Sequence, residues 1–185
     1  MKKQHEMTYD EIVAFHGHDC PGLLLGYRMT RAAMSLIAGD RSEDEEIVAI
    51  VENDACGVDA LQCLTGCTFG KGNLIFRDYG KHVYTIFNRT NRKAVRVSTS
   101  KNQDEKRKSL GLDPNDRQAF ANWLRSAPDD EIMEIKGIPL PEPDFARIHN
   151  SVTCGFCGEL VMETRARVRN GKISCIPCSE ASMTA

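Results

Sequence analysis

Eight cysteines, and a run of two histidines and a cysteine in alternate positions, are the residues of this chain best suited to chemistry. The cysteines fall into two groups of four, separated by a long gap from residue 68 to residue 153. In a reducing compartment, cysteines bind metals or react more often than they form structural disulfides. The eight are Cys20, Cys56, Cys63, Cys67, Cys154, Cys157, Cys175 and Cys178.

The C-terminal four cysteines have the spacing of a zinc site. Two Cys-x-x-Cys pairs, Cys154/Cys157 and Cys175/Cys178, are separated by seventeen residues. Each pair directs two thiolates at one point, and two pairs complete a tetrahedron. The alternatives are two disulfides or four free thiols. A module of about 35 residues has too small a core to fold unaided, so the spacing predicts a structural Zn²⁺ that closes the site and leaves no position for catalysis.

Arginines lie between these two cysteine pairs. Arg165, Arg167 and Arg169 alternate, so on a strand they would share one face, and Asn170-Gly171 is a strong hairpin-turn signal. Such a basic strip could contact the phosphates of a nucleic acid or an acidic protein. A solvated edge strand is the favoured interpretation, so a nucleic acid is a possible but not a favoured partner.

The N-terminal constellation is His16, His18 and Cys20, with Cys56 further along the chain. In an extended segment the first three side chains point the same way. Cys20 precedes Pro21 and Cys56 follows Asp54, so each cysteine lies near an expected helix start, where a thiolate is stabilised. The four are therefore candidate ligands of a second transition metal. Alternatively they are catalytic groups, with Cys20 and Cys56 as reactive thiols and the histidines as bases.

The remaining N-terminal cysteines and the loop after them give weaker signals. Burial as a small apolar side chain is the favoured interpretation for Cys63, and burial and function are equally favoured for Cys67. The loop from residue 68 to residue 73 carries two glycines around Lys71, so its backbone could approach a ligand and Lys71 could contact an anion. The spacing is not that of a nucleotide-binding P-loop.

The pattern of apolar residues predicts a mixed α+β core. Helices are expected over 8–15, from Pro21 to Ala38, and from Cys56 to about Leu64, and a fourth is expected to open at Asp113-Pro114 and run to Trp123. A buried strand is expected over 47–51, and others over 74–78, 82–88 and 93–99. Residues 101–108 are interpreted as a solvated charged stretch, and residues 131–136 as a strand or a helix end. The proline-rich run after residue 138 predicts a core over 1–138, a linker over 139–150 and a finger over 151–185.

Composition limits the classes of protein. The chain has 185 residues and a mass of 20.6 kDa, and it carries a net charge of −2. This favours a globular protein and argues against a whole-protein polyanion binder. The absence of an apolar run of ~20 residues predicts no membrane association, and no signal peptide is visible, so a cytoplasmic protein is expected.

Three motifs carry a resemblance to a known family. FHGHDCPGLLLGYRM, ENDACGVDALQCLTGCTFGKGNL and DYGKHVYTIFNR resemble the E-subunit family of formylmethanofuran dehydrogenase, the FmdE family, over roughly residues 10–135. The resemblance implies an α+β core, a tightly associated homodimer, and a metal or active site that includes His16, His18, Cys20 and Cys56. The C-terminal module resembles the treble-clef zinc finger that some members carry.

The resemblance sets the functional expectation. The parent enzyme is a molybdenum or tungsten complex whose catalytic metal, pterin and iron–sulfur clusters belong to other subunits. The leading hypothesis is therefore a metal-binding accessory protein linked to one-carbon or molybdoenzyme metabolism, and whether it is an enzyme stays open. The alternative is a regulatory protein that senses a metal or ligand in the core and contacts an unknown protein, or a nucleic acid, through the finger. A third hypothesis is a binding module with inert core cysteines.

Overall fold

The computed structural model describes residues 7–113 and 115–181, which fall into two compact units. The first ends at Phe145 and the second begins at Ala146, so the division lies inside the predicted linker. None of the helices in the described ranges is long and apolar enough to cross a membrane.

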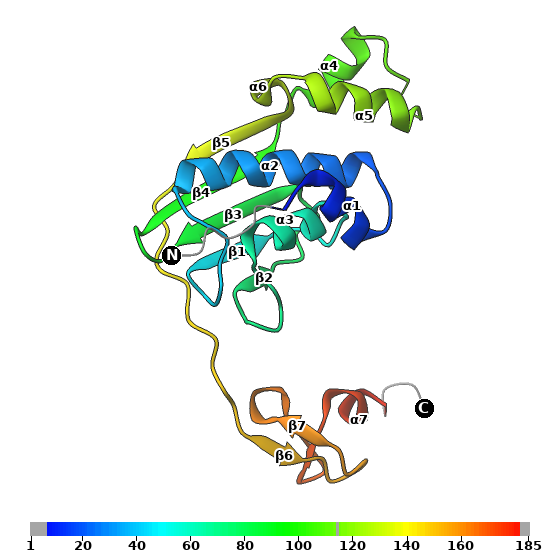
Figure 1. Cartoon of the computed structure of the whole chain (residues 1–185). Helices are drawn as coiled ribbons and strands as arrows, with labels where there is room; N and C mark the ends of the chain where they lie inside the picture. The colour runs from blue at the N-terminus through cyan, green and yellow to red at the C-terminus, as the bar shows by residue number, and fades with distance from the viewer. Residues whose placement is uncertain (1–6, 114, 182–185) are drawn as a thin grey trace. The chain divides into compact units, whose positions relative to one another are not determined.

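A five-stranded mixed sheet forms the centre of the N-terminal unit (Figure 1). The strand order is β2-β1-β3-β4-β5; β1 and β2 run parallel, and the other neighbours are antiparallel. The predicted strands are present. The strands are β1 (Ile47–Val51), β2 (Leu74–Phe76), β3 (Val83–Asn88), β4 (Lys93–Thr99) and β5 (Met133–Gly137).

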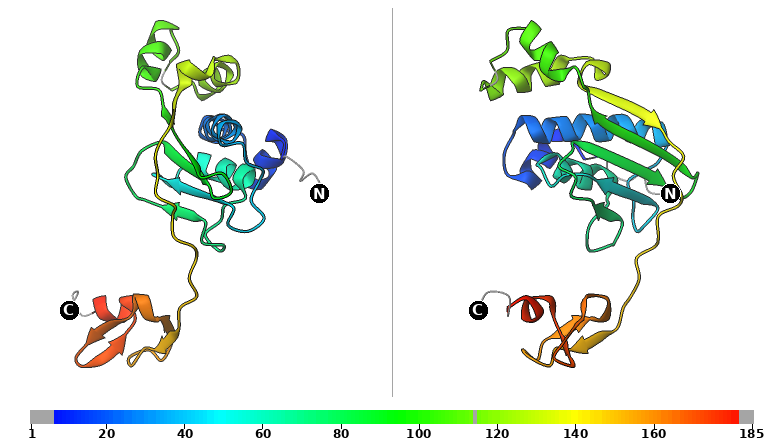
Figure 2. Two further views of the ribbon diagram at one scale, coloured as in Figure 1. Left: turned by 90° about the vertical axis from the view of Figure 1, so that its left-hand side faces the viewer. Right: turned by 180° about the vertical axis from the view of Figure 1, so that it is seen from behind.

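Helices α1 (Tyr9–His16), α2 (Pro21–Ile37) and α3 (Gly57–Thr65) lie on one face of this sheet (Figures 1 and 2). Side chains alternate along each strand, so every second one points at the helices. In β1, for example, Ala49 packs in the main core with Met29 of α2, whereas Val48 packs in a separate cluster on the opposite face. The helix-facing core therefore fixes the positions of the three helices that carry the candidate ligands.

The opposite face of the sheet is covered in part by the residues that follow β5. Ile138 and Leu140 pack on Val48, Phe87 and Ala94. Residues 138–140 therefore belong to the packing of the core and do not form a free spacer.

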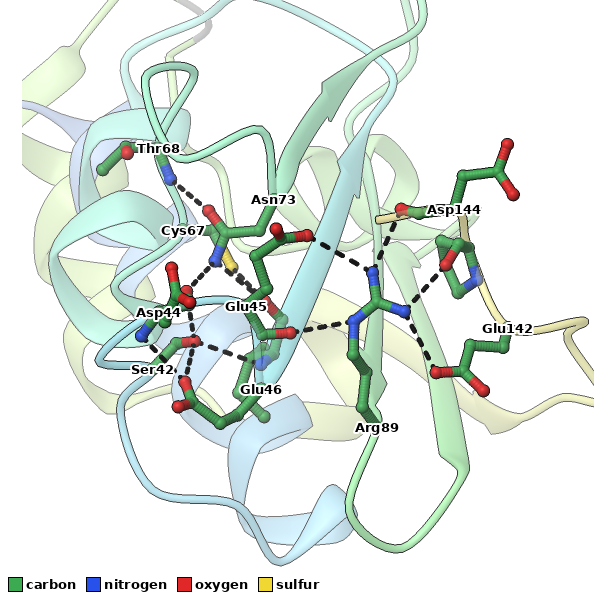
Figure 3. A network of polar contacts seen from close by, with 12 residues as sticks. Ser42, Asp44, Glu45, Glu46, Cys67, Thr68, Asn73, Arg89, Glu142 and Asp144 are labelled. Atoms are coloured by element: carbon green, nitrogen blue, oxygen red, sulfur yellow. Dashed lines mark hydrogen bonds and ion pairs between the residues drawn. The ribbon is translucent and has the colours of Figure 1, made fainter. Parts of the chain in front are cut away.

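The side chain of Arg89 contacts the segment that follows Leu140 (Figure 3). Its guanidinium donates to the Glu142 carboxylate at 3.1 Å and to the carbonyls of Pro143 and Asp144 at 2.8 and 3.1 Å. It also lies 3.7 Å from the centre of the Phe145 ring. Only 8% of the Arg89 side chain is exposed, so these bonds satisfy a nearly buried cation. We call this set the Arg89 contacts.

A second polar network closes the loop before β1 (Figure 3). The Ser42 hydroxyl donates to the Glu46 carboxylate at 2.8 Å, and the backbone N–H of Asp44 donates to the same oxygen at 2.9 Å. Backbone N–H groups, Asp44 first, and the Ser42 hydroxyl hold the pKa of Glu46 below its usual value. The carboxylate is thus an acceptor that shapes the turn into the strand.

Replacing Glu46 with glutamine is expected to lower the free energy of unfolding at neutral pH but not at acidic pH. Because the pKa of Glu46 is lower in the folded protein, ionised Glu46 stabilises the fold above its unfolded pKa, and this is lost as pH falls through the folded value. Urea unfolding, followed by the fluorescence of the single tryptophan Trp123, gives the free energy of unfolding of both proteins. The wild-type protein should be more stable than the variant at pH 7, and this difference should vanish toward pH 3. A difference of equal size at both pH values would contradict the assignment.

Residues 101–108 are largely exposed, as expected for a solvated charged stretch, and they contain a helix, α4 (Gln103–Ser109), with no buried residue. The other prediction about the segment after β4 is wrong. The helix expected to open at Asp113 begins later, as α5 (Arg117–Ser126), because Asp116 and not Asp113 accepts the capping bond, from the N–H of Ala119. Residues 131–136 contain both expected elements, since the short helix α6 (Asp129–Ile132) runs directly into β5.

The C-terminal unit consists of two small hairpins and a helix. In the second hairpin, Asn170 and Gly171 both have positive φ, as the predicted tight turn requires. In the described part of this unit, only Cys154, Ser174 and Cys175 are buried. Its elements are β6 (Ser151–Thr153), β7 (Leu160–Met162), the 3₁₀ turn η1 (Glu163–Arg165), β8 (Arg167–Arg169), β9 (Lys172–Ser174) and α7 (Ile176–Glu180).

Candidate functional site

Three of the four predicted N-terminal ligands converge. One ligand atom each of His16, Cys20 and Cys56 lies within 4.8 Å of the other two, and all three residues are partly buried. The Nε2 atom of His16 is 4.0 Å from the Cys20 Sγ atom. One imidazole and two thiols at this spacing form a donor set that suits a transition metal such as zinc.

Helix ends place all three donors. His16 is the last residue of α1, which Gly17 ends in a left-handed conformation with φ of 95°. Cys20 is the N-cap of α2, as predicted, and its Sγ accepts the N–H of Leu23 at 3.3 Å. Cys56 occupies the N-cap position of α3. Two helix N-termini thus face one point, and both favour negative charge on the cysteine sulfurs.

Glycines allow these helices to approach closely. Gly26 of α2 and Gly57 of α3 pack backbone against backbone, and a Cβ added at Gly57 would lie 3.0 Å from the Gly26 Cα. Gly22, one turn earlier, leaves room for the Cys56 side chain, whose Cβ would be 3.4 Å from a Cβ at this position. The glycine contact therefore determines how near Cys20 and Cys56 can lie.

The two sulfurs are close enough to affect each other's ionisation. Burial, followed by the hydrogen bond and charge of Cys20, raises the pKa of Cys56. Two adjacent thiolates repel, and a bound cation removes that cost because it binds the ionised form of both. The residues present therefore fit a metal ion, with His16, Cys20 and Cys56 as the side chains that would hold it.

His18 is not in the convergent group. Its ring packs against the His16 ring, with centroids 4.5 Å apart, and its side chain is exposed. The alternation that predicted a shared direction fails here because α1 extends through His16 and a left-handed residue follows. Within the described residues, the group therefore supplies three ligands, and a four-coordinate metal would keep one position open.

Asp59 is the side chain that sequence reasoning missed. Its Oδ2 atom is 2.7 Å from the Nδ1 atom of His16, on the opposite side of the ring from Cys20. Its Oδ1 atom accepts the amide N–H of Gln62 at 3.3 Å. A carboxylate three residues after a candidate ligand on an expected helix is the signal that could have identified it.

The two other N-terminal cysteines are buried away from this donor set. Cys63 is 5% exposed and packs with apolar residues of α1, α2 and α3. Cys67 is fully buried; its thiol donates to the Ile47 carbonyl at 3.3 Å, and burial raises its pKa to about 11. Neither belongs to a group of three or more metal-ligand atoms among the described residues.

Lys71 contacts the protein's own backbone. Its ammonium group donates to the carbonyls of Ser42 and Glu43, each at 3.3 Å. Asn73 fixes the loop around it by accepting the N–H of Thr68 and donating to the Asp44 and Ile47 carbonyls (Figure 3). These bonds give the loop a structural role, and contact between Lys71 and an anion stays a prediction.

An open groove of about 540 Å³ lies along α2 between α1 and α6. Tyr9 and Tyr27 form part of its wall, with ring centroids 5.0 Å apart. Arg28, also in the wall, donates to the Leu124 and Ala127 carbonyls at 2.6 Å, and Arg125 pairs with Asp19 next to Cys20. The groove is within the size range of small-molecule sites.

The four C-terminal cysteines converge as predicted. Their Sγ atoms all lie within 4.8 Å of one another, so the cluster can hold a metal ion such as zinc. Backbone N–H groups of Cys157, Cys175 and Phe156 lower the pKa of Cys154 to about 6, whereas contacts with the Cys175 and Cys157 thiols raise the pKa of Cys178 to about 12. A divalent cation would remove the repulsion that keeps Cys178 protonated.

The predicted basic strip is interrupted. Arg165 belongs to the 3₁₀ turn, so only Arg167 and Arg169 lie on β8. Arg169 donates to the Cys178 carbonyl at 2.6 Å and stacks on Phe156. The prediction that three arginines share a strand face is wrong, because the chain turns between Glu163 and Arg165 before the strand begins.

Comparisons with known proteins agree with this architecture. A family model described as "FmdE, Molybdenum formylmethanofuran dehydrogenase operon" matches residues 15–134. A crystal structure of a tungsten formylmethanofuran dehydrogenase FmdE-like protein from Syntrophus aciditrophicus matches with a TM-score of 0.70 and 26% identity over 98% of both chains.

A curated relative is also similar. The chain is 32% identical over 190 residues to the "Probable S-adenosyl-L-methionine-binding protein" of Archaeoglobus fulgidus. The match covers 89% of this chain and 50% of the relative, so the chain spans about half that protein's length.

Proposed function

This chain belongs to the FmdE family, and we propose that it is an accessory protein that binds a transition metal at His16, Cys20 and Cys56 and a structural zinc ion in a treble-clef-like finger. The observation that carries the proposal is the convergence of three donors from three helix ends within 4.8 Å. Packing alone does not require an imidazole and two thiols at one point.

The donor count favours a working metal over a purely structural one. Structural zinc sites are closed by four protein ligands, whereas sites that bind substrates keep a position open. The core group has three ligands among the described residues, and the finger has four. A bound metal would supply Lewis acidity and an exchangeable position. That His18, whose ring packs on the His16 ring, acts as a base stays a prediction.

The wider role we propose is in one-carbon or molybdoenzyme metabolism, in a cytoplasmic homodimer. The names of the matching family and of the FmdE-like solved relative support the metabolic part of this proposal. Both are named for formylmethanofuran dehydrogenase, and the reaction itself would be carried by that enzyme's other subunits. This chain's contribution would be binding at its open metal position.

Metal content tests the proposal. The full-length protein, purified anaerobically without a histidine tag, is expected to hold about two metal ions per chain by plasma mass spectrometry, one in each cluster. The Cys20→Ser/Cys56→Ser variant should hold one, and a Cys63→Ser variant should keep both because Cys63 is outside the group. One zinc ion in the wild-type protein and the same content in the double variant would refute the core site.

The name of the curated relative gives a second candidate, binding of S-adenosyl-L-methionine. The α2 groove offers two tyrosine rings on which a nucleobase could stack. Its Tyr9 hydroxyl donates to Asp19, the residue before Cys20, so the groove lies next to the core donors. Calorimetric titration of the metal-loaded protein should then give saturable binding that a Tyr27→Ala change weakens. No heat above the dilution control would exclude this ligand.

A regulatory role through the finger is the third candidate. Exposed apolar side chains, among them Leu160, Val168 and Ile173, lie on the finger, and the arginine strip is interrupted. A protein partner fits such a surface better than a nucleic acid, because nucleic-acid affinity depends on clustered cations. Binding to mixed RNA or DNA that weakens steeply with added salt would favour nucleic acid instead.

A further inference from the structure

We infer that Asp59 is a positioning residue, which holds the His16 ring so that its Nε2 lone pair faces the two thiols. The inference rests on the proposed metal site and assigns a role to a side chain outside the ligand set. The Oδ2 atom of Asp59 is 2.7 Å from Nδ1, while Nε2 is 4.0 Å from the Cys20 Sγ atom. The ring thus lies between the carboxylate and the sulfur.

The contact selects one tautomer. A carboxylate accepts hydrogen bonds, so the Nδ1 atom facing it carries the proton and Nε2 keeps its lone pair. Only a nitrogen with a free lone pair can bind a metal. Partners of this kind also raise the basicity of the ligand nitrogen.

The carboxylate is itself held in place. Asp59 lies in the first turn of α3, where the helix dipole favours negative charge, and its second oxygen accepts the Gln62 amide at 3.3 Å. His16, in turn, terminates a different helix and is only 11% exposed. The Asp59–His16 bond therefore connects the end of α1 to the start of α3, and it fixes the position of His16 relative to Cys56.

The experiment measures Co²⁺ affinity and ring protonation in the full-length protein with its finger metal in place. The core signal is the difference between the ligand-field spectrum of the wild-type protein and that of Cys20→Ser/Cys56→Ser. Asp59→Ala is expected to weaken core Co²⁺ binding by about 10–100-fold, and Asp59→Asn, which keeps an acceptor oxygen, by less. Asp10→Ala, which removes an exposed carboxylate from α1, should leave the affinity unchanged.

Nitrogen chemical shifts separate positioning from general destabilisation. In the metal-free wild-type protein the His16 ring should be protonated at Nδ1, and in Asp59→Ala it should distribute between both tautomers. If Asp59→Ala does not fold, the Co²⁺ affinity of Asp59→Asn decides whether Asp59 positions His16, and this affinity should be lower than that of the wild-type protein. Unchanged affinity and an unchanged tautomer in a folded variant would overturn the positioning role and leave the metal site standing. No core Co²⁺ binding in the wild-type protein would overturn both.

Discussion

Replacing Gly26 with alanine is expected to separate α2 from α3 and to abolish the core site. A methyl group at Gly26 would overlap the Cα and carbonyl of Gly57, which are backbone atoms and cannot rotate away. Overpacking of this kind costs about 3 kcal/mol, near the upper end of its usual range. For a chain of this size that corresponds to a fall in melting temperature of about 6–12 °C.

The measurement combines stability with metal content. Thermal unfolding followed by Trp123 fluorescence reports on the N-terminal unit, which contains this tryptophan in α5. Gly70→Ala is the matched control, because a Cβ there meets nothing within 4 Å and the backbone φ is not positive. A Gly26→Ala protein with unchanged stability and a full complement of core metal would show that the helix contact does not limit the distance between the thiols.

Removing the metal from the finger is expected to unfold the C-terminal unit and leave the N-terminal unit intact. The described part of this unit buries only Cys154, Ser174 and Cys175, so it lacks an apolar core. Structural zinc in small fingers supplies about 10–16 kcal/mol of apparent binding free energy, which replaces that core. After treatment with a strong chelator, the backbone amides of residues 151–180 should therefore lose their protection from hydrogen exchange.

Hydrogen exchange measured by mass spectrometry tests this by region. Peptides from the finger should exchange at unfolded rates after chelation, while those from β1, β3 and β4 keep their protection and Trp123 fluorescence does not change. A Cys178→Ser variant should resemble the chelated protein, and Cys63→Ser should not. Protection that persists in the finger after its metal has been shown to be absent would mean that disulfides or packing hold it.

The sequence predicted the parts of this protein that depend on local pattern. The four-cysteine cluster, the turn at Asn170-Gly171 and Cys20 at a helix start all follow from spacing and short-range geometry, and each is present. The helix start expected at Asp113 was wrong because cap residues are compatible with several registers, and the choice depends on which N–H the carboxylate reaches.

The candidate site could be predicted only in part, for a reason of distance along the chain. His16, Cys20 and Cys56 were identified by type, but their convergence depends on the Gly26–Gly57 contact, which no local pattern shows. His18 was grouped with them on the assumption of an extended segment, whereas the helix continues through His16. Asp59 was missed because its partner lies 43 positions away.

The Arg89 contacts determine where the finger can be separated from the N-terminal unit. They bind residues 142–145 to the N-terminal unit, so the separable border follows Phe145 and does not coincide with the start of the proline-rich run. A truncation at Pro141 would leave a nearly buried guanidinium without its acceptors in this segment, and the resulting instability would be mistaken for dependence on the finger. Gene fusions that exchange or delete the finger therefore have to preserve the chain through Phe145.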